Sequence, residues 1–303
     1  NYFNLPVKIV VELLESVTGE EETINGHKYY KNLERVATAD GISIKDKYLP
    51  YFKDILDRLH EKDDINYEIR FFYDYEKDFL VKKSLIKVMK NYDLLKYTLD
   101  PKTGEIRLRF PCPHCGLTEK HIWKTQVDEI TNSSISLHSY CPIHGEYSIK
   151  IDKNSDAKFD MNVPLRYLVK ALYLLESDKA NNALSVIVDG GDWSGMWPLR
   201  VYMEPLLKLG YRDVPSIIYT PTILDWSGSK LSKRMYVGNM AYREYFKEGL
   251  INYSEFYNQY GSDAFEILFE EIHGWIEDPK KFIRDYTIEY MDAILRREAI
   301  EIL

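Results

Sequence analysis

The chain has 303 residues, of which 45% are hydrophobic, enough to bury one large core or two modest ones. A formal net charge of −8 excludes indiscriminate binding to nucleic acid, because the average field repels a phosphate backbone; we expect no DNA partner, and RNA would need a local basic face. No run of about 18 apolar residues occurs and the three cysteines fall in one metal-type motif, so we expect no membrane partner and a cytoplasmic location.

Residues 1–100 are expected to alternate helices with a strand. Apolar side chains at three- and four-residue steps predict amphipathic helices, and a proline inside such a pattern predicts an interruption. The expected elements are a helix over 7–14, a helix over 42–61 that is interrupted near Pro50, a strand over 67–73 and a helix over 79–89.

Two short motifs in residues 101–157 have metal-ligand spacing. Cys112 and Cys115 form a Cys-x-x-Cys knuckle, Cys141 and His144 form a matching Cys-x-x-His knuckle, and glycine follows each. A disulfide would leave one of the three cysteines unpaired. Because four protein ligands leave no open coordination position, the motifs predict Zn²⁺ in a structural role.

Four strand-like segments bracket these knuckles and complete the pattern of a zinc-ribbon insertion. They span 106–110, 121–125, 134–138 and 146–151. His114 and His138 are nearby alternatives to His144, although neither holds the matching knuckle position. Basic side chains and Trp123 on the ribbon are available to contact RNA, but basic strand faces are more often solvated.

Residues 158–238 are expected to contain a strand, a helix and a strand in that order. This order predicts a right-handed parallel crossover, with ligand bound at the carboxyl ends of the strands. The expected elements are a helix capped by Asn162 with Pro164 in its first turn, a strand over 184–188, a helix over 198–209 that ends at Gly210, and a strand over 216–220.

A doubly cationic loop follows the second strand. Lys230 and Lys233 lie three residues apart and would offset the charge that develops on pyrophosphate when a carboxylate attacks ATP. One preorganised donor of this kind lowers a barrier by roughly 3–4 kcal/mol. The hydroxyls of Ser229 and Ser232 would bind phosphate oxygens, and Gly228 lets the loop turn. A solvated basic turn is the alternative interpretation.

A glycine-acid turn follows the first strand. Gly190 and Gly191 lack a Cβ and would let the backbone approach a nucleoside. Asp189 or Asp192 would accept hydrogen bonds from ribose hydroxyls. The two predicted nucleotide motifs therefore both follow strands of the expected parallel crossover.

Lys230-Leu-Ser-Lys-Arg234, entered by the apolar, proline-rich run 215–225, resembles the second signature loop of the class I aminoacyl-tRNA synthetases. The run 186–192 resembles the strand and glycine-acid turn beneath the adenosine in that family. The resemblance covers about residues 186–234. It implies an α/β, Rossmann-like parallel nucleotide-binding fold, ATP with Mg²⁺, and activation of an amino acid to an aminoacyl-adenylate that is passed to tRNA.

The first signature of the family, His-x-Gly-His/Asn, is absent from these residues, and we expect the sequence to begin inside or after it, with 7–14 as the helix that follows. The zinc motif and the segment 159–166 resemble the class I lysyl enzymes, whereas the Lys-Leu-Ser-Lys-Arg form resembles the glutamyl group. Asp160, Arg166 and Trp193 are candidate substrate contacts. A helix N-terminal charge and a salt bridge are the alternative for the first two.

Residues 239–303 are expected to form a helical C-terminal segment, which is short for an anticodon-binding domain. Two other functions therefore stay open. A synthetase paralogue would pass the amino acid to an amine or thiol acceptor. A catalytically silent zinc-ribbon protein would bind RNA or a protein partner.

Overall fold

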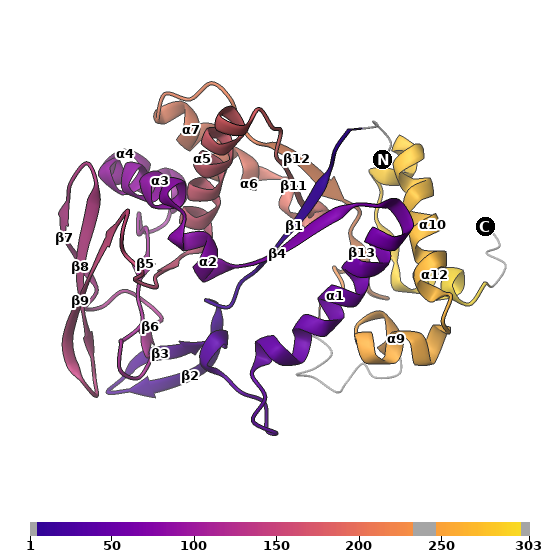
Figure 1. The fold of residues 1–303 in the computed structure, drawn as a ribbon, viewed down its shortest axis with the longest axis horizontal. Helices are drawn as coiled ribbons and strands as arrows, with labels where there is room; N and C mark the ends of the chain where they lie inside the picture. The colour runs from indigo at the N-terminus through magenta and orange to yellow at the C-terminus, as the bar shows by residue number, and fades with distance from the viewer. Residues whose placement is uncertain (1–4, 233–246, 298–303) are drawn as a thin grey trace. The chain divides into compact units, whose positions relative to one another are not determined.

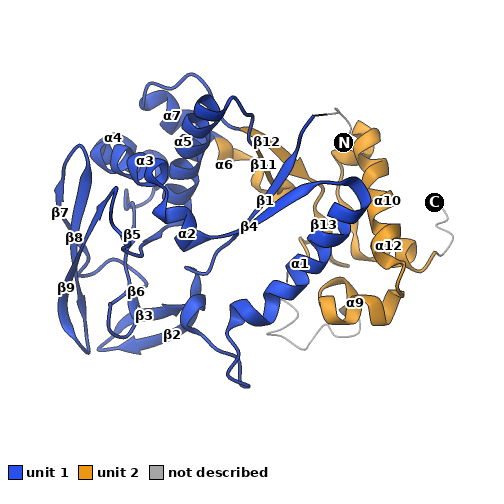
Figure 2. Cartoon of the chain, viewed as in Figure 1, with its two compact units in different colours: residues 1–185, 199–215 blue, residues 186–198, 216–303 orange. Residues whose placement is uncertain are grey.

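The computed structural model describes residues 5–232 and 247–297 and shows a mixed α/β protein (Figure 1). Its contacts divide the chain into two compact units (Figure 2). Unit 1 comprises residues 1–185 and 199–215, and unit 2 comprises residues 186–198 and 216–303. The ribbon segment 101–157 and its flanking residues thus belong to one unit, whereas the predicted boundaries set the ribbon apart.

Unit 1 contains the parallel strand pair β1–β4, the antiparallel sheets β2–β3–β6, β7–β8–β9 and β5–β10, and the helices α1 to α5 and α7. Its strands are β1 (Lys8–Leu13), β2 (Thr18–Ile24), β3 (His27–Asn32), β4 (Asn66–Phe71), β5 (Leu108–Arg109), β6 (Thr118–Glu119), β7 (Gln126–Ile130), β8 (Ser134–Cys141), β9 (Gly145–Asp152) and β10 (Asp160–Met161). Its helices are α1 (Ile44–Asp63), α2 (Phe72–Lys77), α3 (Phe79–Lys90), α4 (Tyr92–Leu99), α5 (Val163–Asn181) and α7 (Glu204–Lys208), with 3-10 turn η1 (Leu33–Arg35) and π-helical turn η3 (Leu199–Met203).

The predicted helix over 7–14 is wrong, because this segment forms strand β1. Ile9, Val10 and Val11 are β-branched and suit a strand. The strand pairs in parallel with β4 over its whole length, from Lys8 opposite Asn66 onward. A short apolar run fits either element, and the distant partner strand decided between them.

The predicted strand over 67–73 ends two residues early, because α2 begins at Phe72. The carboxylate of Glu15 accepts hydrogen bonds from the backbone N–H groups of Phe72, at 2.8 Å, and Tyr73, at 3.0 Å. These N–H groups belong to the first turn of a helix, which has no intrahelical acceptor for them. A side chain from another part of the chain therefore sets this boundary.

Helix α1 is continuous through Pro50, so the predicted interruption is wrong. Ser43 caps the helix by accepting a hydrogen bond from the backbone N–H of Asp46 at 3.0 Å. Proline has no N–H for the carbonyl of Asp46 four residues earlier. Both residues are exposed, so water can serve that carbonyl, and the helix runs on to Asp63.

Helices α3 and α5 pack together in the core of unit 1. Leu85 of α3 and Leu165, Leu168 and Val169 of α5 are fully buried, as the three- and four-residue spacing of the predicted helix requires. Asn162 precedes α5, but its side chain accepts a hydrogen bond from the backbone N–H of Arg107 at 3.3 Å and does not cap the helix.

Glu76 is an acidic side chain in this core, only 2% exposed. Its Oε2 accepts a hydrogen bond from the backbone N–H of Phe159 at 3.4 Å, and Oε1 has no partner among the described residues. Burial raises the pKa of Glu76 well above its usual value, the nearby Asp160 and Glu15 carboxylates add to this rise, and the Phe159 N–H and Arg166 oppose it. Burial therefore favours the neutral form of this carboxyl in the folded protein.

We predict that Glu76→Gln stabilises the protein at alkaline pH. The native state keeps the Glu76 proton above the pH at which the unfolded chain loses it, so stability falls as pH rises from about 4.3 to the folded pKa. Glutamine carries no such cost, and the free energy of unfolding should rise by at least about 1 kcal/mol at pH 8 and change little at pH 4, below the unfolded pKa. Urea denaturation at the two pH values measures this, with the exposed Glu61→Gln as control. Equal stabilisation at both pH values would exclude titration of Glu76 as the cause.

Unit 2 contains a parallel pair, β11–β12, as the sequence predicted, in register from Val186 opposite Ser216 to Gly190 opposite Thr220. A second parallel pair is β13–β14, and the other elements among its described residues are helices and 3-10 turns. Its elements are β11 (Val186–Gly190), η2 (Gly191–Trp193), α6 (Met196–Pro198), β12 (Ser216–Thr220), β13 (Ile223–Leu224), η5 (Glu248–Leu250), α9 (Tyr253–Tyr260), α10 (Ala264–Glu277), α11 (Pro279–Phe282), β14 (Tyr286–Thr287) and α12 (Ile288–Leu295).

The helical C-terminal segment has a core of its own around Trp275, Tyr286 and Met291. The rings of Trp275 and Tyr286 are stacked, with centroids 4.0 Å apart. Ile223 of β13 packs against this core, so the strand that leads into the lysine loop is attached to the C-terminal helices. Helices α9, α10, α11 and α12 lie within the predicted helical segment 239–303, of which residues 239–246 and 298–303 lie outside the described residues.

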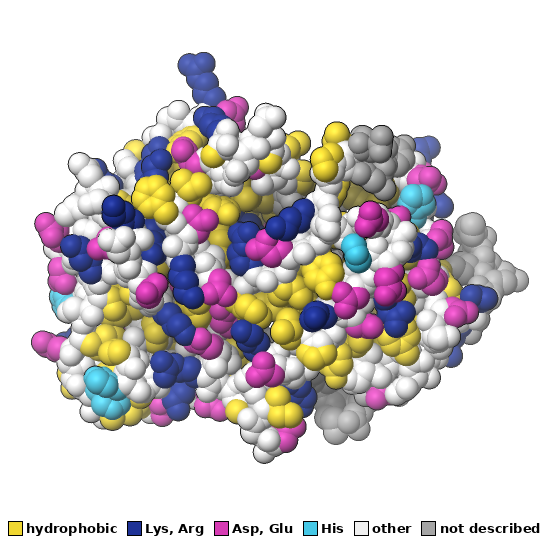
Figure 3. All heavy atoms as spheres, in the orientation of Figure 1, with side chains coloured by type: hydrophobic (Ala, Val, Ile, Leu, Met, Phe, Trp, Pro, Cys, Tyr) yellow, Lys and Arg dark blue, Asp and Glu magenta, His cyan; other side chains and the backbone are white. Residues whose placement is uncertain are grey.

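The sheets of the described residues hold two or three strands each, so the fold class established is mixed α/β with parallel strand pairs. Within the same residues, every helix is too short or too polar to cross a lipid bilayer. On the face seen in Figure 3, acidic and basic side chains are interspersed.

Candidate functional site

The four predicted metal ligands lie together in unit 1. Their ligand atoms, the Sγ atoms of Cys112, Cys115 and Cys141 and a ring nitrogen of His144, all lie within 4.8 Å of one another. His144 Nδ1 is 3.6 Å from the Sγ atoms of Cys112 and Cys141, and Cys115 Sγ is 3.5 Å from Cys141 Sγ. Ligands at ordinary Zn–S and Zn–N distances, about 2.3 and 2.1 Å, lie roughly 3.5–3.8 Å apart around a tetrahedral ion. The cluster can therefore hold a metal ion such as zinc.

Tight turns place these ligands. Gly116 follows the first knuckle with a φ of +76°, and Gly145 follows the second with a φ of +81°, values that favour glycine. The N–H of Gly116 donates to the carbonyl of Cys112 at 2.8 Å, and the second knuckle connects β8 to β9. Cys112 and Cys141 are buried against Tyr29 and Leu117, which excludes water from one side of the cluster.

A metal ion would change the protonation of the cluster. Burial, together with the neighbouring thiols of Cys141 and Cys112, raises the pKa of the Cys115 thiol to about 12 in the protein alone. A divalent cation bound here would displace the thiol protons, because thiols that coordinate such an ion are deprotonated. Three thiols and one imidazole leave a tetrahedral ion no open position, which fits a structural role.

The two alternative histidines lie outside this cluster. His114 has its ring centroid 5.1 Å from that of His144, and the ring Nδ1 of His138 contacts the carboxylate of Asp128 on the neighbouring strand. The four-ligand set among the described residues includes neither of them.

The predicted strand over 121–125 is wrong, because a loop occupies this position. The carboxylate of Glu119, only 3% exposed, accepts hydrogen bonds from the backbone N–H groups of Trp123, Lys124 and Thr125 at 2.8–3.2 Å. In a strand, the backbone N–H groups of successive residues point to opposite sides, so three consecutive N–H groups that bind one carboxylate exclude a strand here. The strand of this region, β7, begins one residue later.

Asp160, a predicted substrate contact, belongs to a buried network in unit 1. Asp160 is only 4% exposed. Its carboxylate accepts a hydrogen bond from the Tyr30 hydroxyl at 2.7 Å and forms an ion pair with Arg109. Burial, followed by the Asp160 charge, raises the pKa of Tyr30. The contacts satisfy this acidic group within the protein, and they join β3 to the β5–β10 sheet.

The other two predicted substrate contacts lie in different units. Arg166 of α5 belongs to unit 1, where its guanidinium lies over the ring of Phe72, 5.8 Å from the centroid. Trp193 belongs to unit 2, where its ring packs edge-on against Trp197 with centroids 4.9 Å apart.

The lysine loop and the glycine-acid turn come together in unit 2. Lys230 Nζ lies 2.6 Å from Asp192 Oδ2, so residues from both predicted nucleotide motifs form an ion pair. Both side chains are partly exposed, and such a pair contributes only about 0–1 kcal/mol. Ser229 is exposed beside Lys230, Ser232 is partly buried, and Lys233 lies outside the described residues.

Local packing favours glycine most strongly at position 191, where a Cβ would meet backbone, whereas at position 190 it would meet only a side-chain oxygen. A Cβ on Gly191 would lie 2.9 Å from the carbonyl oxygen of Thr220, and a Cβ on Gly190 would lie 2.6 Å from Asp192 Oδ1. Asp189 accepts a hydrogen bond from the N–H of Gly190 at 3.0 Å. The missing Cβ of Gly191 therefore lets the backbone of the turn lie against the protein's own strand β12.

Asp225 is a residue of the loop to which the sequence analysis gave no role. It is 3% exposed and accepts hydrogen bonds from the loop that follows it. An aspartate two residues before a serine and three before a glycine is typical of an Asx turn, and this signal was present in the sequence.

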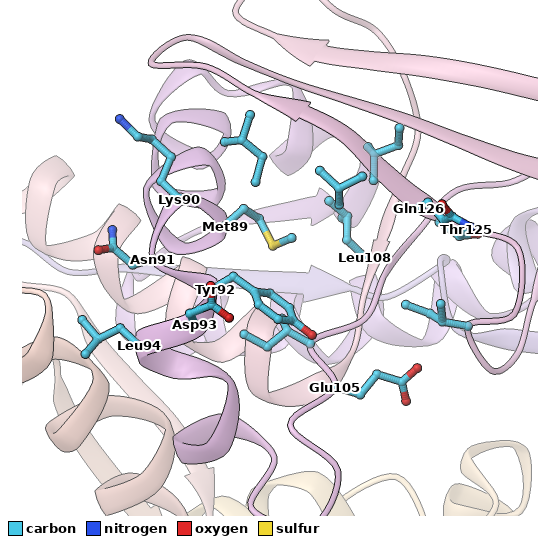
Figure 4. A pocket seen from close by; sticks show the side chains of 15 residues that line it. Met89, Lys90, Asn91, Tyr92, Asp93, Leu94, Glu105, Leu108, Thr125 and Gln126 are labelled. Carbon is cyan, nitrogen blue, oxygen red and sulfur yellow. The ribbon is translucent and has the colours of Figure 1, made fainter.

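A cavity of about 760 Å³ lies in unit 1 between the corner of α3 and α4 and strand β7 (Figure 4). Met89, Tyr92 and Leu108 lie around its centre, and half of the other lining residues are also apolar. None of the predicted site residues lines this cavity, so we assign it no part in the predicted reaction.

Comparison with protein-family models gave no match, and comparison with curated proteins gave no relative. The structure defines a mixed α/β protein with a Cys₃His cluster that can hold a metal ion. Function is therefore inferred from the residues and their geometry.

Proposed function

We propose that the protein activates an amino acid with ATP and passes the aminoacyl group to tRNA, as the resemblance to the class I aminoacyl-tRNA synthetases implies. The observation that supports this most is the ion pair between Lys230 and Asp192, which joins the two nucleotide motifs across 38 residues of sequence. The glycine-acid turn lies at the carboxyl end of β11, and the lysine loop follows β12 and the short strand β13. Ligands of open parallel sheets bind beyond the carboxyl ends of the strands. A Rossmann-like fold is part of this proposal.

In the proposed reaction, the carboxylate of the amino acid attacks the α-phosphorus of ATP. A bond forms between the carboxylate oxygen and phosphorus, the bond to the bridging oxygen breaks, and pyrophosphate leaves with the electron pair. Lys230 and Lys233 offset the charge that develops on pyrophosphate. Ser229 and Ser232 donate hydrogen bonds to phosphate oxygens, and Mg²⁺ bound to ATP supplies further positive charge.

Asp192 has two roles in this proposal. In the protein alone it pairs with Lys230, and with ATP bound it accepts a hydrogen bond from a ribose hydroxyl together with Asp189. The pair is partly exposed and weak, so the phosphates of ATP can compete for the lysine. Zinc at the four-ligand cluster stabilises unit 1 and takes no part in the chemistry.

The first experiment measures ATP–pyrophosphate exchange across the twenty amino acids, with and without total tRNA. Exchange with one amino acid establishes adenylation and identifies the substrate, and a requirement for tRNA supports a tRNA synthetase. Exchange without transfer to tRNA, but with transfer to an amine or thiol, supports the paralogue. Complete silence of the folded, zinc-loaded protein contradicts the proposed activation.

RNA binding without catalysis is the second candidate, and an aromatic contact on the ribbon favours it. Trp123 is 43% exposed, stacks on His27 with ring centroids 3.5 Å apart, and has Lys124 Nζ 5.1 Å from its centroid. Aromatic rings flanked by lysine are the elements that bind unpaired bases.

We predict that Trp123→Ala weakens tRNA binding by roughly tenfold, since stacking contributes about 1–3 kcal/mol per base. The ring is partly exposed, so the zinc content and the melting temperature should stay unchanged. Filter binding at fixed salt concentration measures the affinity, with the exposed Ile143→Ala on the same ribbon as control. Unaltered affinity in Trp123→Ala excludes this ring as an RNA contact.

A further inference from the structure

Asp225 is a buried carboxylate at the entrance to the lysine loop. It directly follows strand β13 and is 3% exposed, although acidic side chains are rarely buried without partners. No step of the proposed reaction uses it.

The partners of this carboxylate lie in the loop itself. Asp225 Oδ1 accepts hydrogen bonds from the Ser227 N–H at 2.9 Å, the Ser227 hydroxyl at 2.6 Å and the Ser229 N–H at 3.1 Å. The backbone of Asp225 closes the same turn, because its N–H donates to the Ser229 carbonyl at 2.7 Å and its carbonyl accepts from the Gly228 N–H at 2.9 Å. Gly228 has a φ of +78°, which favours glycine. One aspartate therefore determines the path of residues 225–229.

The turn is joined to a rigid base. Leu224 and Lys230 form an antiparallel bridge, and the Leu231 N–H donates to the Ile223 carbonyl at 2.8 Å. Strand β13 pairs with β14, and Ile223 packs on the core around Trp275 and Tyr286. The backbone of Lys230 is thus fixed by the turn that precedes it and by the hydrogen bond of Leu231 to β13 that follows it.

We infer that Asp225 is the positioning residue of the lysine loop: its carboxylate fixes the turn from which the Lys230 ammonium reaches Asp192, 2.6 Å away. The catalytic consequence rests on the proposed function, in which the same turn directs Lys230 to the phosphates of ATP. Asp225 contacts neither ATP nor the amino acid in this arrangement. Asp225 acts by holding the backbone of the turn, so the hydrogen-bond acceptor Oδ1 matters more than the negative charge of the carboxylate.

The test compares Asp225→Ala with Asp225→Asn, since asparagine retains an acceptor oxygen at the position of Oδ1. In ATP–pyrophosphate exchange, Asp225→Ala should lower kcat about 100-fold, with a smaller change in the KM for ATP, because the misplaced lysine acts in the transition state. Asp225→Asn should stay within about threefold of the wild type. An equal loss in both variants, or full activity in Asp225→Ala, overturns the inference.

A second measurement does not depend on the proposed function. Hydrogen–deuterium exchange of the segment 225–231 should be about tenfold faster in Asp225→Ala and near wild type in Asp225→Asn, with the exposed Asp213→Ala as control. Should Asp225→Ala not fold, Ser227→Ala, which removes one hydrogen bond, should accelerate exchange by about threefold. Unchanged exchange overturns the inference. If the wild type is inactive with every amino acid, the proposed function fails, while the exchange data still decide the role of Asp225.

Discussion

Replacing Cys112 by serine is expected to remove the metal ion and destabilise unit 1 together. The Cys112 side chain is fully buried, and its Sγ lies 3.6 Å from His144 Nδ1. Binding of structural zinc contributes on the order of 10–16 kcal/mol to the folding of small zinc modules. Loss of one ligand leaves three groups, which bind the ion much more weakly. We expect zinc to fall from about one ion per chain to nearly none. The free energy of unfolding should fall by roughly 4 kcal/mol. Elemental analysis and thermal melting of one preparation measure both.

The matched control is His114→Ala. This ring lies close to His144, with centroids 5.1 Å apart, but outside the four-ligand cluster. Zinc content and melting temperature should therefore stay at wild-type values. Full zinc occupancy and unchanged melting in Cys112→Ser would remove Cys112 from the ligand set, and loss of zinc in His114→Ala would place His114 in it.

Replacing Lys230 by alanine is expected to abolish most of the amino-acid activation while the fold persists. Removal of one preorganised donor to a developing negative charge costs about 100- to 1000-fold in kcat. The ion pair with Asp192 is partly exposed, so its loss should change the free energy of unfolding by less than about 1 kcal/mol. Lys233→Ala should lower the activity in the same way. Steady-state ATP–pyrophosphate exchange and urea denaturation measure the two effects separately.

The control for this prediction is Lys280→Ala, an exposed lysine of unit 2 in α11. It should keep both activity and stability. Activity within threefold of the wild type in Lys230→Ala would return the loop to the alternative of a solvated basic turn. A large loss of stability in that variant would instead make the ion pair with Asp192 a structural element.

Local patterns predicted the long helices and several strands well. The apolar spacing of 79–89 and of the segment after Asn162 corresponds to α3 and α5, because both helices bury one face in the same core. The strand over 134–138 is the first part of β8, and the strand over 146–151 is the centre of β9. Periodicity is informative where one face of an element is buried and the other is not.

Distant partners explain the local predictions that were wrong. The run 7–14 is a strand because β4 pairs with it, the strand from 67 stops where Glu15 binds two backbone N–H groups, and 121–125 is a loop because Glu119 binds three. In each case, groups far along the sequence or across a turn supply hydrogen bonds that outweigh a weak local preference.

The sequence by itself determined the metal cluster, since two knuckles of fixed spacing and the small number of cysteines leave few other arrangements. It also indicated the parallel pair β11–β12 and the order of the two nucleotide motifs. Only the tertiary structure decided that Lys230 pairs with Asp192, that Asp160 is held by Tyr30 and Arg109, and that Asp225 closes the lysine loop. The physical reason is that spacing limits which ligands can surround one ion, whereas the partners of a buried charge depend on which elements pack around it.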